Sequence, residues 1–135
     1  MRILESALYA ENLEETAVFY ERILKLERIA TVPGRHVFFR AGEAVLLLFQ
    51  PSATREPPKP EARVKVPPHG TKGDGHLCFA ATAEEIAGWC DHLAREGIEI
   101  EADFTWPQGG RSIYFRDPAG NSIEIAEPRI WNFAQ

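Results

Sequence analysis

The chain has few cysteines, no excess of positive charge and no long apolar run, and each absence excludes a class of protein. Its two cysteines, Cys78 and Cys90, are too few for a disulfide framework, and we expect buried thiols in a cytoplasmic protein. A net charge of −5 argues against nonspecific nucleic-acid binding. No apolar stretch approaches the ~18 residues that a membrane-spanning helix needs, so no membrane partner is expected. The first residues show no signal-peptide pattern.

What remains is the composition of an ordinary globular protein. Hydrophobic residues make up 44% of the chain and charged residues 26%, both typical of a soluble domain. A length of 135 residues is enough for one domain with a sizeable core. We therefore expect a single domain over residues 1–135.

The most informative feature is an internal repeat, because residues 3–51 and 76–128 pass through the same order of patterns. Each copy begins with a short apolar strand and continues with an amphipathic helix, which starts at a capping box formed by Asn12 with Glu15 or by Thr82 with Glu85. A repeat of about 50 residues is one unit that cannot bury its apolar face alone. The repeat predicts a pseudo-twofold domain with a ligand held between its halves.

Hydrophobic periodicity and turn residues give the expected elements of each copy. We expect strands over 4–10, 27–32, 36–40 and 44–50 in the first copy, and over 76–81, 98–104, 112–116 and 122–127 in the second. Helices are expected over 12–24 and from Thr82 to a terminating Gly97. The last three strands of each copy are joined by short turns, so they should form antiparallel meanders.

The residues outside the repeat are a proline-rich segment and a short tail. Residues 52–74 contain five prolines and exclude helix and central strand. Residues 52–73 contain five basic and two acidic side chains, a local net charge of +3. This segment fits a solvated linker as well as a lid that favours an anionic ligand. In the tail, 129–135, Trp131 and Phe133 are expected to cover the core or an interface.

Strand alternation selects three side chains for the concave face. Ile123 and Ile125 must face the helix layer, so Glu124 lies on the opposite face of its strand. Alternation likewise assigns His76 and Glu5 to the concave side of theirs. Each of the three, taken alone, fits a solvent-facing or hydrogen-bonded residue better. Two glutamates and a histidine converging from three strands would form a divalent-metal site.

Three segments, 12–20, 75–79 and 114–124, carry a family resemblance. They read NLEETAVFY, GHLCF and YFRDPAGNSIE. The chain resembles the vicinal oxygen chelate superfamily, which includes glyoxalase I-like lyases, bleomycin-resistance proteins, fosfomycin-resistance transferases and extradiol dioxygenases. The resemblance implies an α+β fold of paired βαβββ modules, 3–51 and 75–128, which form a curved, barrel-like mixed sheet with a cleft.

The resemblance also implies one divalent metal ion, of Fe, Mn, Zn, Ni, Co or Mg, held at the positions of Glu5, His76 and Glu124. The first position is usually histidine or glutamine in the family, and a glutamate there favours harder metals. Glyoxalase I-like lyases place a fourth, glutamate ligand where this chain has Leu47. That difference argues against strict glutathione-hemithioacetal lyase activity.

We therefore expect a metal-dependent enzyme of lyase or isomerase type that acts on a small vicinal-oxygen substrate. An extradiol-type dioxygenase and a metal-free binding protein of the bleomycin-resistance type are the alternatives. The expected catalytic residues are Glu124 and His69, although His69 also fits a plain loop histidine. The side chains expected to contact substrate are Arg111, Tyr114, Tyr9 and Trp106, which also fit a surface turn and core aromatics. The modules pair within one chain or across a dimer, and we expect a homodimer.

Overall fold

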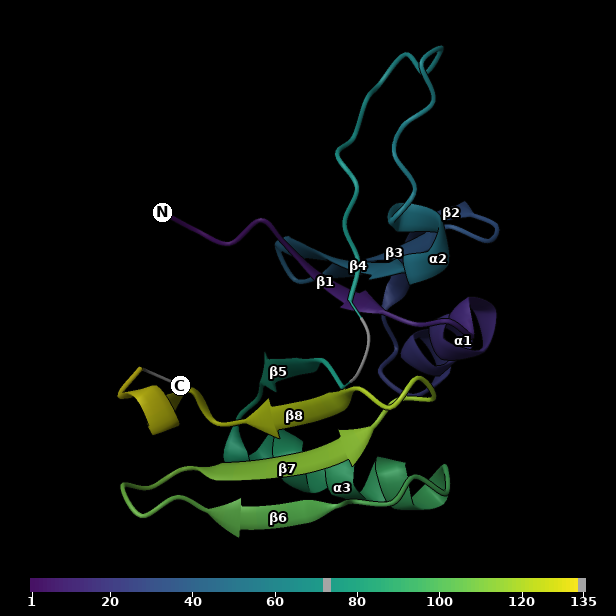
Figure 1. Ribbon diagram of the computed structural model, residues 1–135. Coiled ribbons are helices and arrows are strands. Elements are labelled where there is room, and N and C mark those ends of the chain that lie inside the picture. The colour runs from purple at the N-terminus through teal and green to yellow at the C-terminus, as the bar shows by residue number, and fades with distance from the viewer. Residues whose placement is uncertain (72–73, 134–135) are drawn as a thin grey trace. The chain divides into compact units, whose positions relative to one another are not determined.

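The computed structural model describes residues 1–71 and 74–133 (Figure 1). The chain divides into two compact units, Met1–Gly73 and Asp74–Gln135. Across the described residues, no helix combines the length and the apolar character that a bilayer crossing requires.

The first unit holds one copy of the predicted module. Its elements are β1 (Glu5–Tyr9), α1 (Leu13–Arg22), β2 (Glu27–Val32), β3 (His36–Ala41), β4 (Ala44–Phe49) and the one-turn helix α2 (Pro51–Thr54). The strands form one mixed sheet in the order β1-β4-β3-β2. β1 runs parallel to β4, while β2, β3 and β4 form the predicted antiparallel meander.

The second unit repeats this plan. Its elements are β5 (His76–Ala80), α3 (Ala83–Arg95), β6 (Ala102–Thr105), β7 (Arg111–Arg116), β8 (Ser122–Ala126) and the 3-10 helix η1 (Pro128–Trp131). The sheet order is β5-β8-β7-β6, with β5 parallel to β8. The α+β class and the two βαβββ modules are confirmed, although β6 begins four residues later than the predicted start at Ile98.

Each unit builds its core between its helix and one face of its sheet. In the second unit, α3 lies across that face (Figure 1), and Ile86 and Leu93 at helical spacing are fully buried. The strand residues that share this core are Ile113, Phe115, Ile123 and Ile125. Their period of two confirms the predicted faces of β7 and β8. Burial of each such side chain contributes about 1.5–3 kcal/mol to folding. Because this stabilisation comes from the core face, the opposite face of the sheet can carry polar groups.

The two helix starts differ in detail. Thr82 confirms its predicted cap, since its hydroxyl oxygen accepts the Glu85 backbone N–H at 3.1 Å. At Asn12 the predicted capping box is wrong, because the side chain makes no capping hydrogen bond to the helix backbone and its amide donates to the Glu15 carboxylate at 3.1 Å instead. At the far end of α3, Gly97 has φ of +72°, as predicted for a residue that ends a helix.

The turn between β7 and β8 fixes the strand that carries His76. One carboxylate oxygen of Asp117 accepts the backbone N–H groups of Ala119 and Asn121, both at 2.9 Å. Gly120 supplies the left-handed conformation, with φ of +92°. The Asn121 side chain then accepts the Gly75 N–H at 2.9 Å, which places the start of β5 beside β8.

The structure corrects the prediction that both cysteines are buried. Cys78 is exposed and Cys90 is half-buried. Alternation explains Cys78, because Leu77 and Phe79 turn toward the helix layer and leave the thiol on the open face.

The tail and the proline-rich segment also differ from expectation. Trp131 and Phe133 are 72% and 68% exposed, so the prediction that they cover the core is wrong, and Ile130 packs there instead. A role for the two aromatics at an interface stays a prediction. The prediction that 52–74 contains no helix is wrong at its start, because α2 extends to Thr54. Proline is tolerated in a first helical turn, where its missing N–H is not needed.

Candidate metal and substrate site

The open face of the second sheet carries three of the predicted site residues, His76, Tyr114 and Glu124. Glu124 on β8 lies opposite Cys78 on β5 and Tyr114 on β7 in the strand register. Cross-strand partners share a face, so these side chains and His76 stand on the side away from α3. The strand order therefore brings together residues that are far apart in the sequence.

Glu124 is buried, with 6% of its surface exposed, and is held by a short chain of hydrogen bonds. The Ser112 hydroxyl donates to Glu124 Oε1 at 2.6 Å. That hydroxyl in turn accepts the Trp106 indole N–H at 2.8 Å. An indole N–H can only donate, so the direction of the chain is fixed and ends on the carboxylate as acceptor. One oxygen of Glu124, Oε2, remains outside this chain.

His76 turns a lone pair toward that second oxygen. Its Nδ1 lies 2.9 Å from the Ser122 carbonyl oxygen, which can only accept, so Nδ1 carries the hydrogen. The other ring nitrogen, Nε2, lies 3.2 Å from Glu124 Oε2. Two acceptors this close require a proton or a cation between them. A neutral imidazole whose N–H donates to a carbonyl is the usual arrangement of a metal-ligating histidine, so the pair fits a divalent metal.

The structure brings together two of the three predicted metal ligands. Within residues 1–71 and 74–133, no group of three histidine, cysteine, aspartate or glutamate side chains is gathered as a metal site. His76 and Glu124 belong to the second unit, while Glu5 lies on the open face of the sheet in the first. Glu5 as the third ligand stays a prediction.

Aromatic rings and neutral donors surround the pair. Partial burial, and then the neighbouring Glu124 carboxylate, raise the pKa of Tyr114 to about 12 and the pKa of Cys78 to about 12. Both groups are therefore protonated at neutral pH. The Tyr114 ring stacks with His76 and with Phe104, at centroid distances of 6.1 and 5.7 Å. Tyr114 is thus a hydrogen-bond donor built into an aromatic wall.

Arg111 lies elsewhere. It starts β7 on the face that α3 covers, where its guanidinium makes two hydrogen bonds to Asp103, at 2.8 and 2.7 Å. It also contacts Cys90 Sγ at 3.5 Å. Asp103 raises the pKa of Arg111 further above its ordinary value. The structure therefore places Arg111 with Asp103 and Cys90, on the opposite side of the sheet from Glu124.

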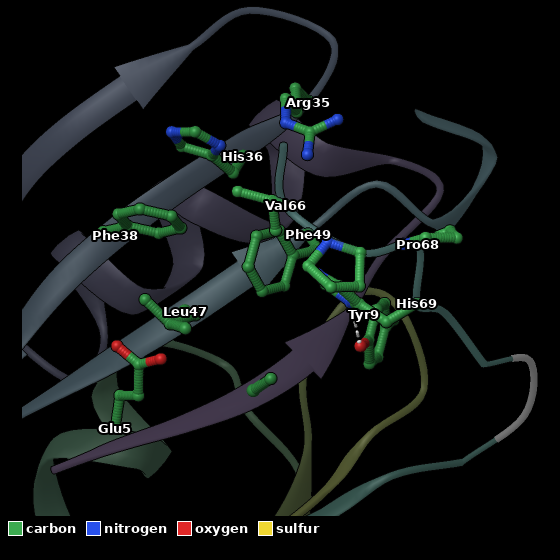
Figure 2. A pocket seen from close by; sticks show the side chains of 12 residues that line it. Glu5, Tyr9, Arg35, His36, Phe38, Leu47, Phe49, Val66, Pro68 and His69 are labelled. Carbon is green, nitrogen blue, oxygen red and sulfur yellow. Dashed lines mark hydrogen bonds between the residues drawn. The ribbon is translucent and has the colours of Figure 1, made fainter. Parts of the chain in front are cut away.

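The first unit contains an aromatic pocket on the open face of its sheet (Figure 2). The cavity has a volume of about 690 Å³. Its floor comes from β1, β3 and β4, and residues 66–69 of the proline-rich segment form its roof. The lining side chains are Glu5, Ala7, Tyr9, Arg35, His36, Phe38, Leu47, Phe49, Val66, Pro67, Pro68 and His69.

Two predicted site residues meet in this pocket. The Tyr9 hydroxyl lies 2.6 Å from His69 Nδ1, and a dashed line marks this hydrogen bond in Figure 2. Burial raises the pKa of Tyr9, which keeps its phenol protonated and able to donate. The His69 backbone N–H donates to the Thr54 carbonyl at 3.0 Å, and its ring lies edge-on to Phe49. His69 is thus held over the sheet rather than projecting from a plain loop.

The registers of the two sheets show where the copies have diverged. Ala7 pairs with Leu47 in the first sheet as Cys78 pairs with Glu124 in the second, so Leu47 occupies the place of Glu124. This confirms the alignment predicted from the repeat. By the same comparison, Phe38 stands where the second unit has Tyr114.

Sequence reasoning missed several residues of both faces, namely Ser112, Arg35, His36, Phe38 and Phe49. The alternation of β3 and β4 was a usable signal for the aromatics, because they share a face with Leu47. A serine in a strand gives no comparable signal.

Comparison with known proteins agrees with this geometry. A family model described as the Glyoxalase/Bleomycin resistance protein/Dioxygenase superfamily matches residues 2–125. The crystal structure of lactoylglutathione lyase from Agrobacterium tumefaciens is similar to this chain at 38% identity, with 98% of each chain covered and a TM-score of 0.90. A virulence protein from Salmonella typhimurium is 28% identical over 94% of this chain and 96% of its own, with a TM-score of 0.69.

A genomically encoded fosfomycin resistance protein from Listeria monocytogenes shares the fold, at 19% identity over 93% of this chain and 88% of its own, with a TM-score of 0.67. The family match spans both βαβββ modules and includes β1, β5 and nearly all of β8. The chain belongs to the Glyoxalase/Bleomycin resistance protein/Dioxygenase superfamily.

Proposed function

We propose that the protein is a metal-dependent enzyme of lyase or isomerase type, acting on a small substrate with two neighbouring oxygen atoms. The observation that supports this most directly is the pairing of His76 Nε2 with Glu124 Oε2 at 3.2 Å. The Nδ1 hydrogen of His76 is donated to the Ser122 carbonyl, so Nε2 and Oε2 need a proton or a cation between them. A divalent cation satisfies both acceptors at once.

The donor set suits such an ion. His76 and Glu124, with Glu5 as a third ligand, would hold one ion of Fe, Mn, Zn, Ni, Co or Mg. Two carboxylates and one imidazole favour the harder members of this group. When bound, the ion supplies Lewis-acid polarisation of the two substrate oxygens.

The protein's own side chains would move the proton. Ser112 occupies Glu124 Oε1, so both proposed roles fall on Oε2, which would hold the ion through one lone pair and accept a proton from the carbon beside the substrate carbonyl through the other. Return of that proton to a neighbouring carbon gives isomerisation. In a lyase reaction the bond to a group on the adjacent carbon breaks instead, and the departing group takes the electron pair and the proton. The protonated Tyr114 hydroxyl can donate to the oxygen on which negative charge develops. In the first unit, Tyr9 engages His69 Nδ1, so Nε2 of His69 would serve as the second acid or base.

One similar protein supports a lyase-type reaction, while the internal repeat shows that this chain lacks one metal ligand. The lactoylglutathione lyase from Agrobacterium shares 38% of its residues with this chain over 98% of both lengths. Leu47, in the place equivalent to Glu124, leaves the set without a fourth ligand, which would have been its third carboxylate. We therefore propose a vicinal-oxygen substrate that a three-ligand site can process.

Metal analysis tests this function. The protein purified without chelator should contain about one divalent ion per chain, and His76→Ala or Glu124→Gln should reduce this below about a tenth. His92→Ala and Glu99→Gln are matched controls elsewhere in the second unit and should retain the metal. Wild-type protein with less than about a tenth of an equivalent would contradict the proposal.

The aromatic pocket favours a second candidate, a metal-free protein that binds a small aromatic molecule. Glu124→Gln, which changes a residue outside the aromatic pocket, separates the two functions. If the enzyme proposal holds, this variant loses metal uptake. If the binding function holds, ligand-dependent thermal stabilisation is the same in the variant and the wild type.

A further inference from the structure

We infer that the pocket on the first sheet binds an aromatic carboxylate, with its ring against Phe38 and Phe49 and its carboxylate at Arg35. In identifying this ligand with the substrate, the inference rests on the proposed function. As a binding site it depends only on residues of the first unit.

The size of the pocket points to a ligand larger than a minimal vicinal-oxygen compound. Its volume of about 690 Å³ lies within the ~300–1,000 Å³ range of sites that enclose ligands of one or more rings. A three-carbon molecule would leave most of the apolar wall in contact with water. Ala7 creates much of this space, because its small side chain lies on β1 between Glu5 and Tyr9.

The wall is built for a flat ring. His36 and Phe38 stack almost in parallel, with centroids 4.0 Å apart and planes 9° apart. Phe49 lies nearly perpendicular to Phe38, at 5.5 Å and 81°. A ligand ring can stack on one of these surfaces while its edge meets the other, which are the two favoured aromatic geometries. The roof residues Val66, Pro67 and Pro68 add apolar surface from above.

The two ends of the pocket carry side chains of opposite charge. Figure 2 shows Arg35 and Glu5 on opposite sides of Leu47 and Phe38. Arg35 donates to the Ala53 carbonyl at 3.4 Å, and no acidic residue of the described chain pairs with it. A half-buried guanidinium without a carboxylate partner is suited to binding one from a ligand. The anionic group therefore belongs at the Arg35 end.

His36 adds a polar atom beside Arg35. Its Nδ1 is buried and has no hydrogen-bond partner among the described residues. Burial, and then the neighbouring Arg35, lower the pKa of His36, so the ring is neutral at neutral pH. The neutral ring therefore adds no second positive charge, so Arg35 alone sets the charge preference at this end of the pocket.

Binding to metal-free protein tests the inference. Full-length protein treated with EDTA is titrated by calorimetry with 2-naphthoate and with 2-naphthamide, which has the same shape without the charge. We expect the carboxylate to bind about tenfold more tightly than the amide, and Arg35→Gln to remove that advantage. Arg40→Gln is the matched control, since Arg40 lies on β3 outside the pocket, 3.9 Å from Glu27.

A second variant tests the cavity itself. Ala7→Phe fills the space with a ring and should abolish binding of both probes, while its circular dichroism spectrum stays that of the wild type. Equal affinity for the acid and the amide, or an unchanged acid affinity in Arg35→Gln, would overturn the carboxylate assignment. Undiminished binding in Ala7→Phe would overturn the pocket. Because no metal is present, these failures are distinct from a loss of metal in His76→Ala.

Discussion

At the scale of single residues, a buried hydroxyl decides which oxygen of Glu124 is available. Ser112 is fully buried and its one hydrogen goes to Glu124 Oε1. The Trp106 indole, donating to the same hydroxyl, prevents that hydrogen from turning elsewhere. The arrangement orients the carboxylate so that Oε2 faces His76. Ser112 is therefore a positioning residue for the proposed metal ligand.

We predict that Ser112→Ala weakens both the fold and metal binding. The change leaves Glu124 Oε1 and the Trp106 N–H without their partner, which costs about 1–3 kcal/mol of unfolding free energy. Loss of orientation should weaken Mn²⁺ binding by about 10–100-fold, measured by calorimetry. Trp106→Phe removes only the outer donor and should have a smaller effect. Wild-type Mn²⁺ affinity in Ser112→Ala would show that the hydroxyl does not position the ligand.

Residue patterns identified the carboxylate and the imidazole of this site but not their support. Alternation in β8 and β5 is strict, so the isoleucines of β8 forced Glu124 outward and predicted His76 beside it. Ser112 gave no such signal, since a strand serine fits a wet face as well as a buried one. The two glycines before Arg111 suggested a loop residue that could reach a ligand. In the structure Arg111 begins β7, and strand alternation places its side chain beside Asp103.

At the scale of elements, ion pairs link the edge strand β6 to β7. The carboxylate of Asp103 receives both hydrogen bonds of the Arg111 fork, and this lowers the pKa of Asp103 below its ordinary value. A carboxyl whose pKa is depressed by folding stabilises the protein above its unfolded pKa. The contribution is lost as pH falls through the lowered value.

We predict that Asp103→Asn lowers stability at pH 7 but has progressively less effect toward pH 3. Half-exposed pairs are screened by solvent, so the loss at pH 7 should be about 0.5–1 kcal/mol in urea unfolding. Asp91→Asn, on the exposed side of α3, is the control and should change stability little at either pH. A deficit for Asp103→Asn that persists unchanged into acid would rule out the ion pair as its cause.

The roof of the first pocket is an element held by few contacts. His69 reaches the Thr54 carbonyl through its backbone and the Tyr9 phenol through its ring. The two prolines inside this segment, Pro67 and Pro68, limit its conformations but provide no N–H groups for further bonds. The Tyr9 hydroxyl should therefore contribute much of the roof's local stability.

We predict that Tyr9→Phe accelerates hydrogen exchange of the His69 amide. The substitution keeps the ring but removes a hydrogen bond worth about 0.5–1.5 kcal/mol, which corresponds to about 2–10-fold faster exchange through local opening. Amide exchange followed by NMR measures this, with Leu46 in the β3–β4 ladder as the internal control that should not change. Equal His69 exchange in the variant and the wild type would mean that the phenol does not hold the roof.

Elements with a clear period were predictable and the others were not. The helices and strands of both modules follow from apolar spacing, because packing against one core imposes that spacing. The roof and α2 lie in a segment whose prolines interrupt any period. Their positions depend instead on individual contacts, such as the one between Tyr9 and His69, that have no regular sequence pattern.

At the scale of the whole molecule, the two copies of the repeat have divided their chemistry. The second unit carries the carboxylate, the imidazole and their hydrogen-bond donors. At the equivalent strand positions the first unit carries Leu47 and Phe38, which make an apolar pocket. Substitution at a few positions of the open face is enough for this divergence, because the core face that specifies the fold is unaffected.

The tail leads to a prediction about assembly. Trp131 and Phe133 are 72% and 68% exposed, which is unusual for large aromatic side chains of a monomer. Each chain presents the same pair, so a twofold contact between copies would cover both at once. Light scattering on the wild type should therefore give about 30 kDa, twice the 15.2 kDa of one chain.

Substituting both aromatics, Trp131→Glu with Phe133→Glu, should halve that mass by placing charges in the contact. Val64→Glu is the matched control, since Val64 is also 72% exposed but lies in the proline-rich segment. A wild-type mass near that of one chain would refute the dimer, and a dimeric double variant would show that the contact lies elsewhere.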